Sequence, residues 1–407
     1  MKRRRNNRAG LADIWRVESQ SRPVRHCGVS ERCSSLVDMF RRLAQGAVAA
    51  GALALFAFAW RCDEPWFDRH VFLPQQYFIS ASRGIVFWSR ATAAGSAALL
   101  LLLVPFMPRG AAGRRLLAAV LLAVPAAEAL LQWRLRRMVN PGLAEAMDTL
   151  TTWDPRHGFT LTASMDRLHS MSGRQIRFRT DAAGRRISGA AIDPALPSLV
   201  FAGESAVAGI GLQWEETFPA ILGARLHLQV VNLGSPAYRI DQSWLRLKDE
   251  LPKLEHPIAV IGLFMPGLVG RSFAGQRHPL VRPSPSGGIE LLPPEPPALL
   301  QRSGLYRLWK HLYWSDAAVE EGMRSVSMVL REIAALAKAR GAPCIFLVTG
   351  RTPQWMLHDL FEVPALDYVV AELPEQALLT DGHPGPRGSI DIADALEPRL
   401  RTRIAHR

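Results

Sequence analysis

The chain has 407 residues, enough for more than one domain, and 48% of them are hydrophobic, a high share for a wholly soluble protein. A formal net charge of +13 could indicate a nucleic-acid-binding protein. Residues 1–42, however, hold eleven basic and only four acidic side chains and so supply seven of these charges. We therefore expect no nucleic-acid partner. The four cysteines show no metal-ligand or disulfide spacing, and we predict no metal and no cofactor.

Three apolar stretches follow the basic tail, at about 43–60, 91–107 and 116–133. Each is about long enough to cross a bilayer of roughly 30 Å as a helix. Buried core helices are the alternative, but the first two stretches have no polar face. A cleaved signal peptide fits poorly because the first apolar run begins only after residue 42. We predict a three-helix membrane region over residues 43–133, with the lipid bilayer as a partner.

The distribution of arginines predicts the orientation of these helices. The basic tail, residues 1–42, is expected in the cytoplasm, and three crossings then place everything after Trp133 outside. Arg134, Arg136 and Arg137 oppose this at the third crossing. We give the tail more weight because the first helix usually dominates orientation.

A linker over residues 134–152 leads into a domain over residues 153–407, where short apolar runs alternate with helical patterns. Strands are predicted at 199–202, 228–231, 258–264 and 345–348, and helices at 218–225, 241–251, 316–340 and 389–401. This alternation favours a parallel sheet with helices on both faces, a three-layer α/β/α domain. Seven prolines between 276 and 299 are expected to exclude regular structure, which indicates an inserted loop near the site.

Two short segments of this domain carry its chemistry, Val200–Gly209 and Asp381–Gly388. The first predicts a strand that ends in a small-residue turn with Ser205 at its tip. The second places Asp381 and His383 just before a helix. A serine in such a turn is often only a helix cap, and Asp-Gly-His is often only a loop. Their order along the chain, nucleophile first and Asp/His last, favours a serine hydrolase.

The chain at this point resembles the SGNH, or GDSL-like, hydrolase superfamily. Its first block is similar to Gly203-Glu-Ser205 with Gly209, Gly211 and Thr217-Phe-Pro219, and its second to Val231-Asn-Leu-Gly234. Its last block is similar to Asp381-Gly-His383-Pro384 with Gly388. The segment from Trp153 to Arg186, with Asp181-Ala-Ala-Gly-Arg-Arg, resembles the region that precedes the domain in membrane-attached bacterial members. The first block is not the G-x-S-x-G elbow of other hydrolases.

The resemblance implies a flavodoxin-like SGNH domain in which Ser205 is the nucleophile, His383 the general base and Asp381 its orienting carboxylate. The amides of Ser205 and Gly234 would form the oxyanion hole, with Gly203 and Glu204 supporting the turn. The implied activity is hydrolysis or transfer of an ester, as an esterase, deacetylase or acyltransferase acting on an acylated lipid or cell-envelope polysaccharide. The domain would face the periplasm or cell exterior from a bacterial inner membrane.

Two departures from the family pattern leave an alternative open. Glu204 stands where the family has aspartate, and Ile261–Leu268 lacks the asparagine whose side chain donates to the oxyanion. Loss of one such donor costs roughly 3 to 4 kcal/mol of transition-state stabilisation, about a hundred- to a thousand-fold in rate. The alternative is a catalytically impaired SGNH-fold protein that binds a ligand or serves as a scaffold in an envelope assembly.

Overall fold

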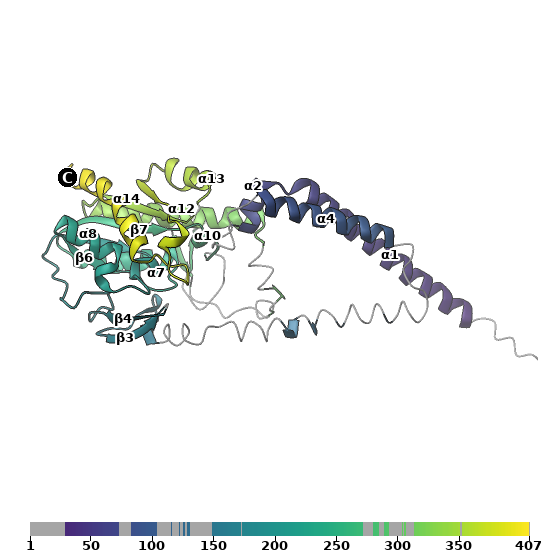
Figure 1. Ribbon diagram of the computed structural model, residues 1–407, viewed down its shortest axis with the longest axis horizontal. Coiled ribbons are helices and arrows are strands. Elements are labelled where there is room, and N and C mark those ends of the chain that lie inside the picture. Colours follow the sequence, from purple (N-terminus) through teal and green to yellow (C-terminus); the bar gives the residue numbers. More distant parts are fainter. Residues whose placement is uncertain are drawn as a thin grey trace, which may run out of the picture. The chain divides into compact units, whose positions relative to one another are not determined.

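The computed structural model describes residues 29–72, 83–103, 149–171, 173–271, 280–284, 289–292, 313–350 and 352–406, with isolated positions among 115–130 and 303–306. The chain forms two compact units, residues 1–57 with 94–118 and residues 58–93 with 119–407. The second unit contains the α/β domain (Figure 1).

The apolar N-terminal stretches are helical where the structure describes them, in α1 (Val29–Arg61) and α4 (Arg83–Leu103). Within the described residues, no single helix meets the length and hydropathy required of a membrane span. The pair Gln45–Arg61 and Glu64–Val71 meets them only together, with a bend of 107° between its halves, and Val86–Leu102 is apolar but shorter. Asp63 lies at this bend and caps the second helix, where its side chain accepts from the Trp66 amide at 3.0 Å. The structure therefore does not support the predicted three spans, and most of 116–133 lies outside the described residues.

The segment after this break contacts the α/β domain. It comprises α2 (Glu64–Phe67) and the π-helical turn η1 (Asp68–Phe72). His70 and Trp314 are joined by two polar contacts. His70 Nδ1 lies 2.6 Å from the Trp314 carbonyl oxygen, and the Trp314 amide donates to the His70 carbonyl at 2.9 Å. Arg69 lies 3.2 Å from the carboxylate of Asp316. Residues preceding α4 are thus in contact with the start of α12.

Two antiparallel hairpins precede the sheet: β1 (Thr151–Asp154) pairs with β2 (Gly158–Leu161), and β3 (Asp166–Met171) with β4 (Arg174–Arg179). Their buried side chains form a small cluster that also contains Ala208 and Ile210, residues just after the predicted nucleophile. Tyr238 Oη donates to the Phe159 carbonyl at 2.9 Å. The hairpins, which sequence reasoning left unassigned, therefore pack against the segment that carries Ser205.

The predicted parallel sheet is confirmed, with five strands in the order β11-β10-β7-β5-β6. Four strands match the prediction to within about a residue, whereas β11 was not predicted. This order is the doubly wound, flavodoxin-like one, in which ligands bind where the strand order reverses. Here that point lies beyond the carboxyl ends of β5 and β7. The strands are β5 (Ser198–Ala202), β6 (Gln229–Asn232), β7 (Pro257–Phe264), β10 (Cys344–Thr349) and β11 (Tyr368–Ala371).

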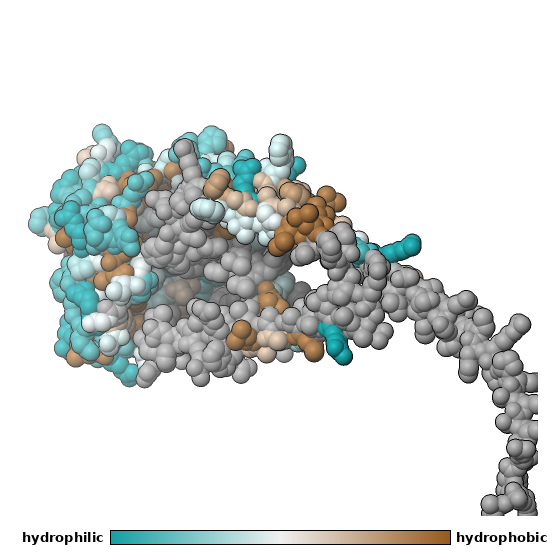
Figure 2. Space-filling view, turned by 45° about the vertical axis from the view of Figure 1, so that its right-hand side comes forward, coloured by the Kyte–Doolittle hydropathy of each residue, from teal (hydrophilic) through white to brown (hydrophobic). Residues whose placement is uncertain are grey.

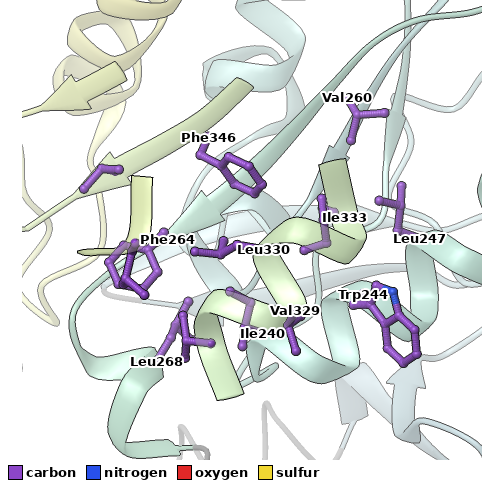
Figure 3. Packing of buried hydrophobic residues seen from close by; sticks show 14 of the residues in the cluster. Ile240, Trp244, Leu247, Val260, Phe264, Leu268, Val329, Leu330, Ile333 and Phe346 are labelled. Carbon is purple, nitrogen blue, oxygen red and sulfur yellow. The ribbon is translucent and has the colours of Figure 1, made fainter. Parts of the chain in front are cut away.

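Helices cover both faces of the sheet, as the three-layer prediction requires. On one face α9 (Ile240–Glu250) and α12 (Asp316–Ala339) pack in one buried cluster, and Figure 3 shows side chains from both around Phe264 and Phe346. On the other face α8 (Phe218–Leu226) and α14 (Pro386–Ala405) form a second cluster. The shorter elements are η3 (Trp214–Glu216), η4 (Leu251–Lys253), α10 (Gly267–Arg271), α13 (Gln354–Leu357), η6 (His358–Glu362) and η7 (Glu375–Ala377).

The prediction that prolines exclude regular structure from 276–299 was wrong in part. Strands β8 (Leu280–Pro283) and β9 (Ile289–Leu292) form an antiparallel pair inside this stretch. A two-stranded sheet consists only of edge strands, where proline is tolerated because half of the N–H groups face outward. Pro283 is the last residue of β8, where it ends the strand.

The buried pair Phe264 and Phe361, whose ring centroids lie 5.4 Å apart, gives a test of the core. We expect Phe264→Ala to lower the free energy of unfolding by about 3 to 5 kcal/mol, because the removed ring leaves a cavity between β7 and η6. Urea unfolding followed by tryptophan fluorescence measures this loss. Val363→Ala, at a position 64% exposed, serves as the control and should change stability by less than about 0.5 kcal/mol.

Candidate active site

Ser205 is the first residue of α7 (Ser205–Ala208), a single helical turn that begins three residues after the end of β5, the strand between β7 and β6. Its side chain is largely buried, with 7% exposure of the residue. The hydroxyl lies 3.3 Å from Glu204 Oε1, and Glu204, in an extended conformation, occupies the cap position of the turn. The strand thus delivers the serine hydroxyl to the carboxyl edge of the sheet, as the sequence predicted.

His383 reaches the same point from the other end of the domain. It lies in the turn between η7 and α14, where the Leu379 amide donates to the His383 carbonyl at 2.7 Å and the Gly385 amide donates to the Ala377 carbonyl at 2.8 Å. These bonds fix the backbone on both sides of the ring. His383 Nε2 lies 2.8 Å from Ser205 Oγ, although the two residues are 178 positions apart. A hydroxyl and an imidazole nitrogen at this distance can exchange a proton.

Asp381 lies on the far side of the imidazole. Its Oδ1 is 3.1 Å from His383 Nδ1 and accepts from the His383 backbone amide at 3.2 Å. The Nδ1 contact has the distance of an ion pair but not the alignment of a hydrogen bond. Hydrogen bonds between catalytic residues are often poorly aligned without substrate and become shorter and better aligned in the reacting complex. With Nε2 accepting from Ser205, the imidazole proton is assigned to Nδ1, facing Asp381.

The two predicted oxyanion donors differ in their surroundings. The amide of Ser205 is at the first position of α7, where a helix offers it no acceptor. The amide of Gly234 instead donates to Asn232 Oδ1 at 2.9 Å. Asn232 is fully buried, and its Nδ2 donates to the Val207 carbonyl at 2.7 Å. In this structure one of the two predicted donors is therefore already engaged by Asn232.

Gly203 and Gly234 are required by packing around α7. A Cβ at Gly234 would lie 2.4 Å from the Ala208 nitrogen, and a Cβ at Gly203 would lie 2.5 Å from a methyl carbon of Val207 and 2.7 Å from Leu263 Cβ. Both distances are far below van der Waals contact. These glycines let β5, β7 and the loop after β6 close around the turn that carries Ser205.

The residues that follow β7, where the sequence resemblance leads to the expectation of an asparagine, have no side-chain donor. Strand β7 ends at Phe264, and Met265 and Pro266, both partly buried, follow it before α10. A thioether and a pyrrolidine ring have no N–H or O–H to offer an oxyanion. The absence noted in the sequence is thus not compensated at this position.

Sequence reasoning missed two residues beside Ser205. Asn232 was noted only as part of the second block, with no contact assigned to it, and Arg186 was given no role, yet Arg186 is completely buried against the carbonyls that follow α7. The Asp-Ala-Ala-Gly turn that precedes Arg186 is visible in the sequence, but the sequence does not show that the arginine after this turn is buried. Among the described residues no group of three His, Cys, Asp or Glu side chains could hold a metal ion.

No family model and no curated protein matches this chain. Solved structures that resemble it include GDSL-family lipolytic proteins from Desulfitobacterium hafniense, at 15% identity over 50% of this chain and 98% of that one, and from Veillonella parvula, at 10% over 51% and 98%, both with a TM-score of 0.31. An acetyl xylan esterase from Butyrivibrio proteoclasticus is similar at 12% identity over 63% and 85%, with a TM-score of 0.34. At these scores the likeness does not by itself assign an activity.

The contact between Ser205 and His383 predicts an activated hydroxyl. We expect His383→Ala to slow labelling of the full-length protein by a fluorophosphonate at least about a hundred-fold, because the base that accepts the serine proton is removed. Asp381→Asn should slow labelling less, since the base itself remains. Gel fluorescence against time gives the rates. His358→Ala is the matched control, because this exposed histidine pairs with Glu362 at 3.1 Å; equal loss there would contradict the assignment.

Proposed function

We propose that this protein is an SGNH-type ester hydrolase whose nucleophile is Ser205. The observation that carries the proposal is the 2.8 Å contact between Ser205 Oγ and His383 Nε2, formed at the carboxyl edge of a parallel sheet. A serine that served only as a helix cap would not need an imidazole at its hydroxyl. Asp381 at the opposite ring nitrogen supports the same reading, since it completes the order of a Ser-His-Asp triad.

In this mechanism Ser205 Oγ attacks the carbonyl carbon of an ester while its proton passes to His383 Nε2. The carbonyl oxygen becomes an oxyanion that accepts from the Ser205 amide. Collapse of the tetrahedral intermediate breaks the bond to the alcohol oxygen, which takes the proton from His383. Water then attacks the acyl-serine and gives a proton to His383. The bond between the acyl carbon and Ser205 Oγ breaks, His383 returns the proton to Oγ, and the acid is released. Asp381 holds the imidazole and stabilises its positive charge.

The oxyanion is the weak point of the proposed site. The Gly234 amide can join the hole only by sharing or releasing its bond to Asn232, and Met265 and Pro266 offer no third donor. We therefore expect turnover roughly a hundred- to a thousand-fold below that of an enzyme with a complete hole.

Turnover of p-nitrophenyl acetate by the full-length protein tests the proposal. We expect measurable hydrolysis that Ser205→Ala reduces to the uncatalysed rate, because no hydroxyl remains to attack. Ser243→Ala is a matched control, since this buried serine of α9 donates to the carbonyl of Arg239, the residue that caps the helix, and is not one of the proposed site residues. Equal rates for wild type and Ser205→Ala would sink the assignment.

We further propose that the protein is anchored in a membrane and acts on an acylated lipid or cell-envelope polysaccharide. The apolar helices α1 and α4 support this proposal. Large apolar side chains near their ends are also exposed: Trp60, Phe87 and Trp88 are 88%, 61% and 68% exposed. Such aromatics favour the bilayer interface. By contrast, hydrophilic residues predominate among the coloured residues on the face of the α/β domain that Figure 2 shows.

Carbonate extraction of expressing cells tests this anchoring. An anchored protein stays in the membrane pellet at high pH, whereas a peripheral one is released, because carbonate removes electrostatic attachment but not apolar insertion. We expect the full chain to remain in the pellet. Its recovery in the supernatant would contradict the proposal.

The second candidate is an SGNH-fold protein that has lost turnover and binds a ligand. The engaged Gly234 amide and the missing third donor favour it. Fluorophosphonate labelling and turnover together separate the two candidates. Labelling at Ser205 with no ester turnover would favour binding, whereas labelling with turnover favours the enzyme.

A further inference from the structure

Arg186 is among the largest side chains that are fully buried in this protein. The turn before it explains how it is directed inward. Asp181 Oδ1 accepts from the amides of Ala183 and Arg185 at 2.9 Å each, and Gly184 adopts a positive φ of 69°. Arg185 then turns to Asp181, 2.7 Å away, whereas Arg186 enters the domain.

The guanidinium of Arg186 bonds to the backbone that follows Ser205. One nitrogen donates to the carbonyls of Ala208 and Gly209, the second of these at 2.5 Å, and the other nitrogen donates to Leu212 at 2.5 Å. Ala208 is the last residue of α7, so the cation lies at the carboxyl end of the turn that Ser205 begins. A cation is favourable there because the last carbonyls of a helix have no partner within it. A Cβ at Gly209 would lie 2.6 Å from this guanidinium, so the glycine makes room for it.

Burial of this charge is costly, and its surroundings compensate for it only in part. The guanidinium lies 4.2 Å from the centre of the Phe178 ring. Burial lowers the pKa of Arg186 to about 9, opposed by the charges of Glu215 and Glu216. The side chain therefore stays cationic at neutral pH. Burying a cation costs desolvation free energy that an apolar side chain of similar volume would not require. Packing alone therefore does not explain an arginine at this position.

The backbone of Arg186 continues the same contact on the other side. It forms an isolated antiparallel bridge with Asn232, the residue at the end of β6. Asn232 in turn donates to the Val207 carbonyl at 2.7 Å and accepts from the Gly234 amide at 2.9 Å. Arg186 thus contacts the end of α7 through its side chain and the loop of Gly234 through its main chain.

We propose that Arg186 is a positioning residue that fixes the α7 turn so that the Ser205 hydroxyl and amide face the reacting carbonyl. The role rests on the proposed function of Ser205. It makes the hairpin region before the sheet part of the catalytic apparatus, because the residue that holds the nucleophile turn comes from that region and not from the α/β core.

The test compares Arg186→Met, Arg186→Lys and the wild type as full-length proteins. Methionine keeps much of the apolar volume but removes the guanidinium donors from the carbonyls of Ala208, Gly209 and Leu212, of which Gly209 keeps its bond from the Leu212 amide. Lysine keeps the charge as a single point. Hydrogen–deuterium exchange is measured on peptides that cover residues 203–213. We expect faster exchange in this segment for Arg186→Met and an intermediate rate for Arg186→Lys, with the other strands of the sheet unchanged.

The same proteins are assayed with p-nitrophenyl acetate. A displacement of a catalytic group by about 1 Å can lower the reaction rate about a hundred-fold. We therefore expect kcat for Arg186→Met to fall about ten- to a hundred-fold, with KM within about two-fold of wild type. Arg186→Lys should recover part of kcat. Arg185→Met is the matched control, since Arg185 pairs with Asp181 and lies 3.5 Å from Glu250, away from α7; its kcat and its exchange in 203–213 should match the wild type.

Arg186 is not a positioning residue if folded Arg186→Met, at equal thermal stability or after correction for the folded fraction, keeps wild-type exchange in 203–213. Wild-type kcat in that variant would overturn the proposal as well. A wild-type protein without ester turnover would instead contradict the proposed function, and the exchange measurement would still decide whether Arg186 holds the α7 turn.

Discussion

The structure depends on the burial of strand β5 between β6 and β7. All five residues of β5 are buried, and its hydrogen bonds are shared with a parallel neighbour on each side. Because parallel strands end at the same edge, this pairing places the turns after β5, β6 and β7 together. The nucleophile turn, the Asn232 loop and the Met265-Pro266 segment follow these three strands. The nucleophile side of the candidate site is therefore set by which residues follow three adjacent strands, whereas Asp381 and His383 come from the turn between η7 and α14.

Most of the central architecture could be predicted because burial leaves a direct mark on sequence. Apolar runs such as 258–264 match β7 closely, and the long amphipathic pattern of 316–340 matches α12. Strand β11 was missed because it is an edge strand with only one fully buried residue, Ala371. The hairpins β1 to β4 were missed for a similar reason. Their short strands are stabilised by contacts with α9 and with the segment after α7. Such long-range contacts are not visible in local periodicity.

The candidate site was predicted unevenly for the same physical reason. Ser205, His383 and Asp381 could be named because short motifs mark them. The bond between Asn232 and the Gly234 amide could not be foreseen, since it depends on the rotamer of a buried side chain at the end of β6. Arg186 shows the same limit more strongly: an arginine in a polar turn is normally solvated, and only the folded chain reveals the carbonyls that surround it. Motifs identify reacting groups, whereas tertiary packing determines what holds them.

The contact between η1 and the start of α12 has a consequence for what counts as the domain. Trp314 is only 8% exposed, and part of its cover comes from residues that precede α4 by more than ten positions in the chain. A fragment that began at residue 153 would lose the two bonds between His70 and Trp314 and the ion pair of Arg69 with Asp316. It would also expose the indole and the neighbouring Tyr313 ring, which stacks on Trp66. The folding unit is thus discontinuous in sequence. A cut at the predicted linker would leave exposed aromatic side chains, which favour aggregation, on the part that carries Ser205.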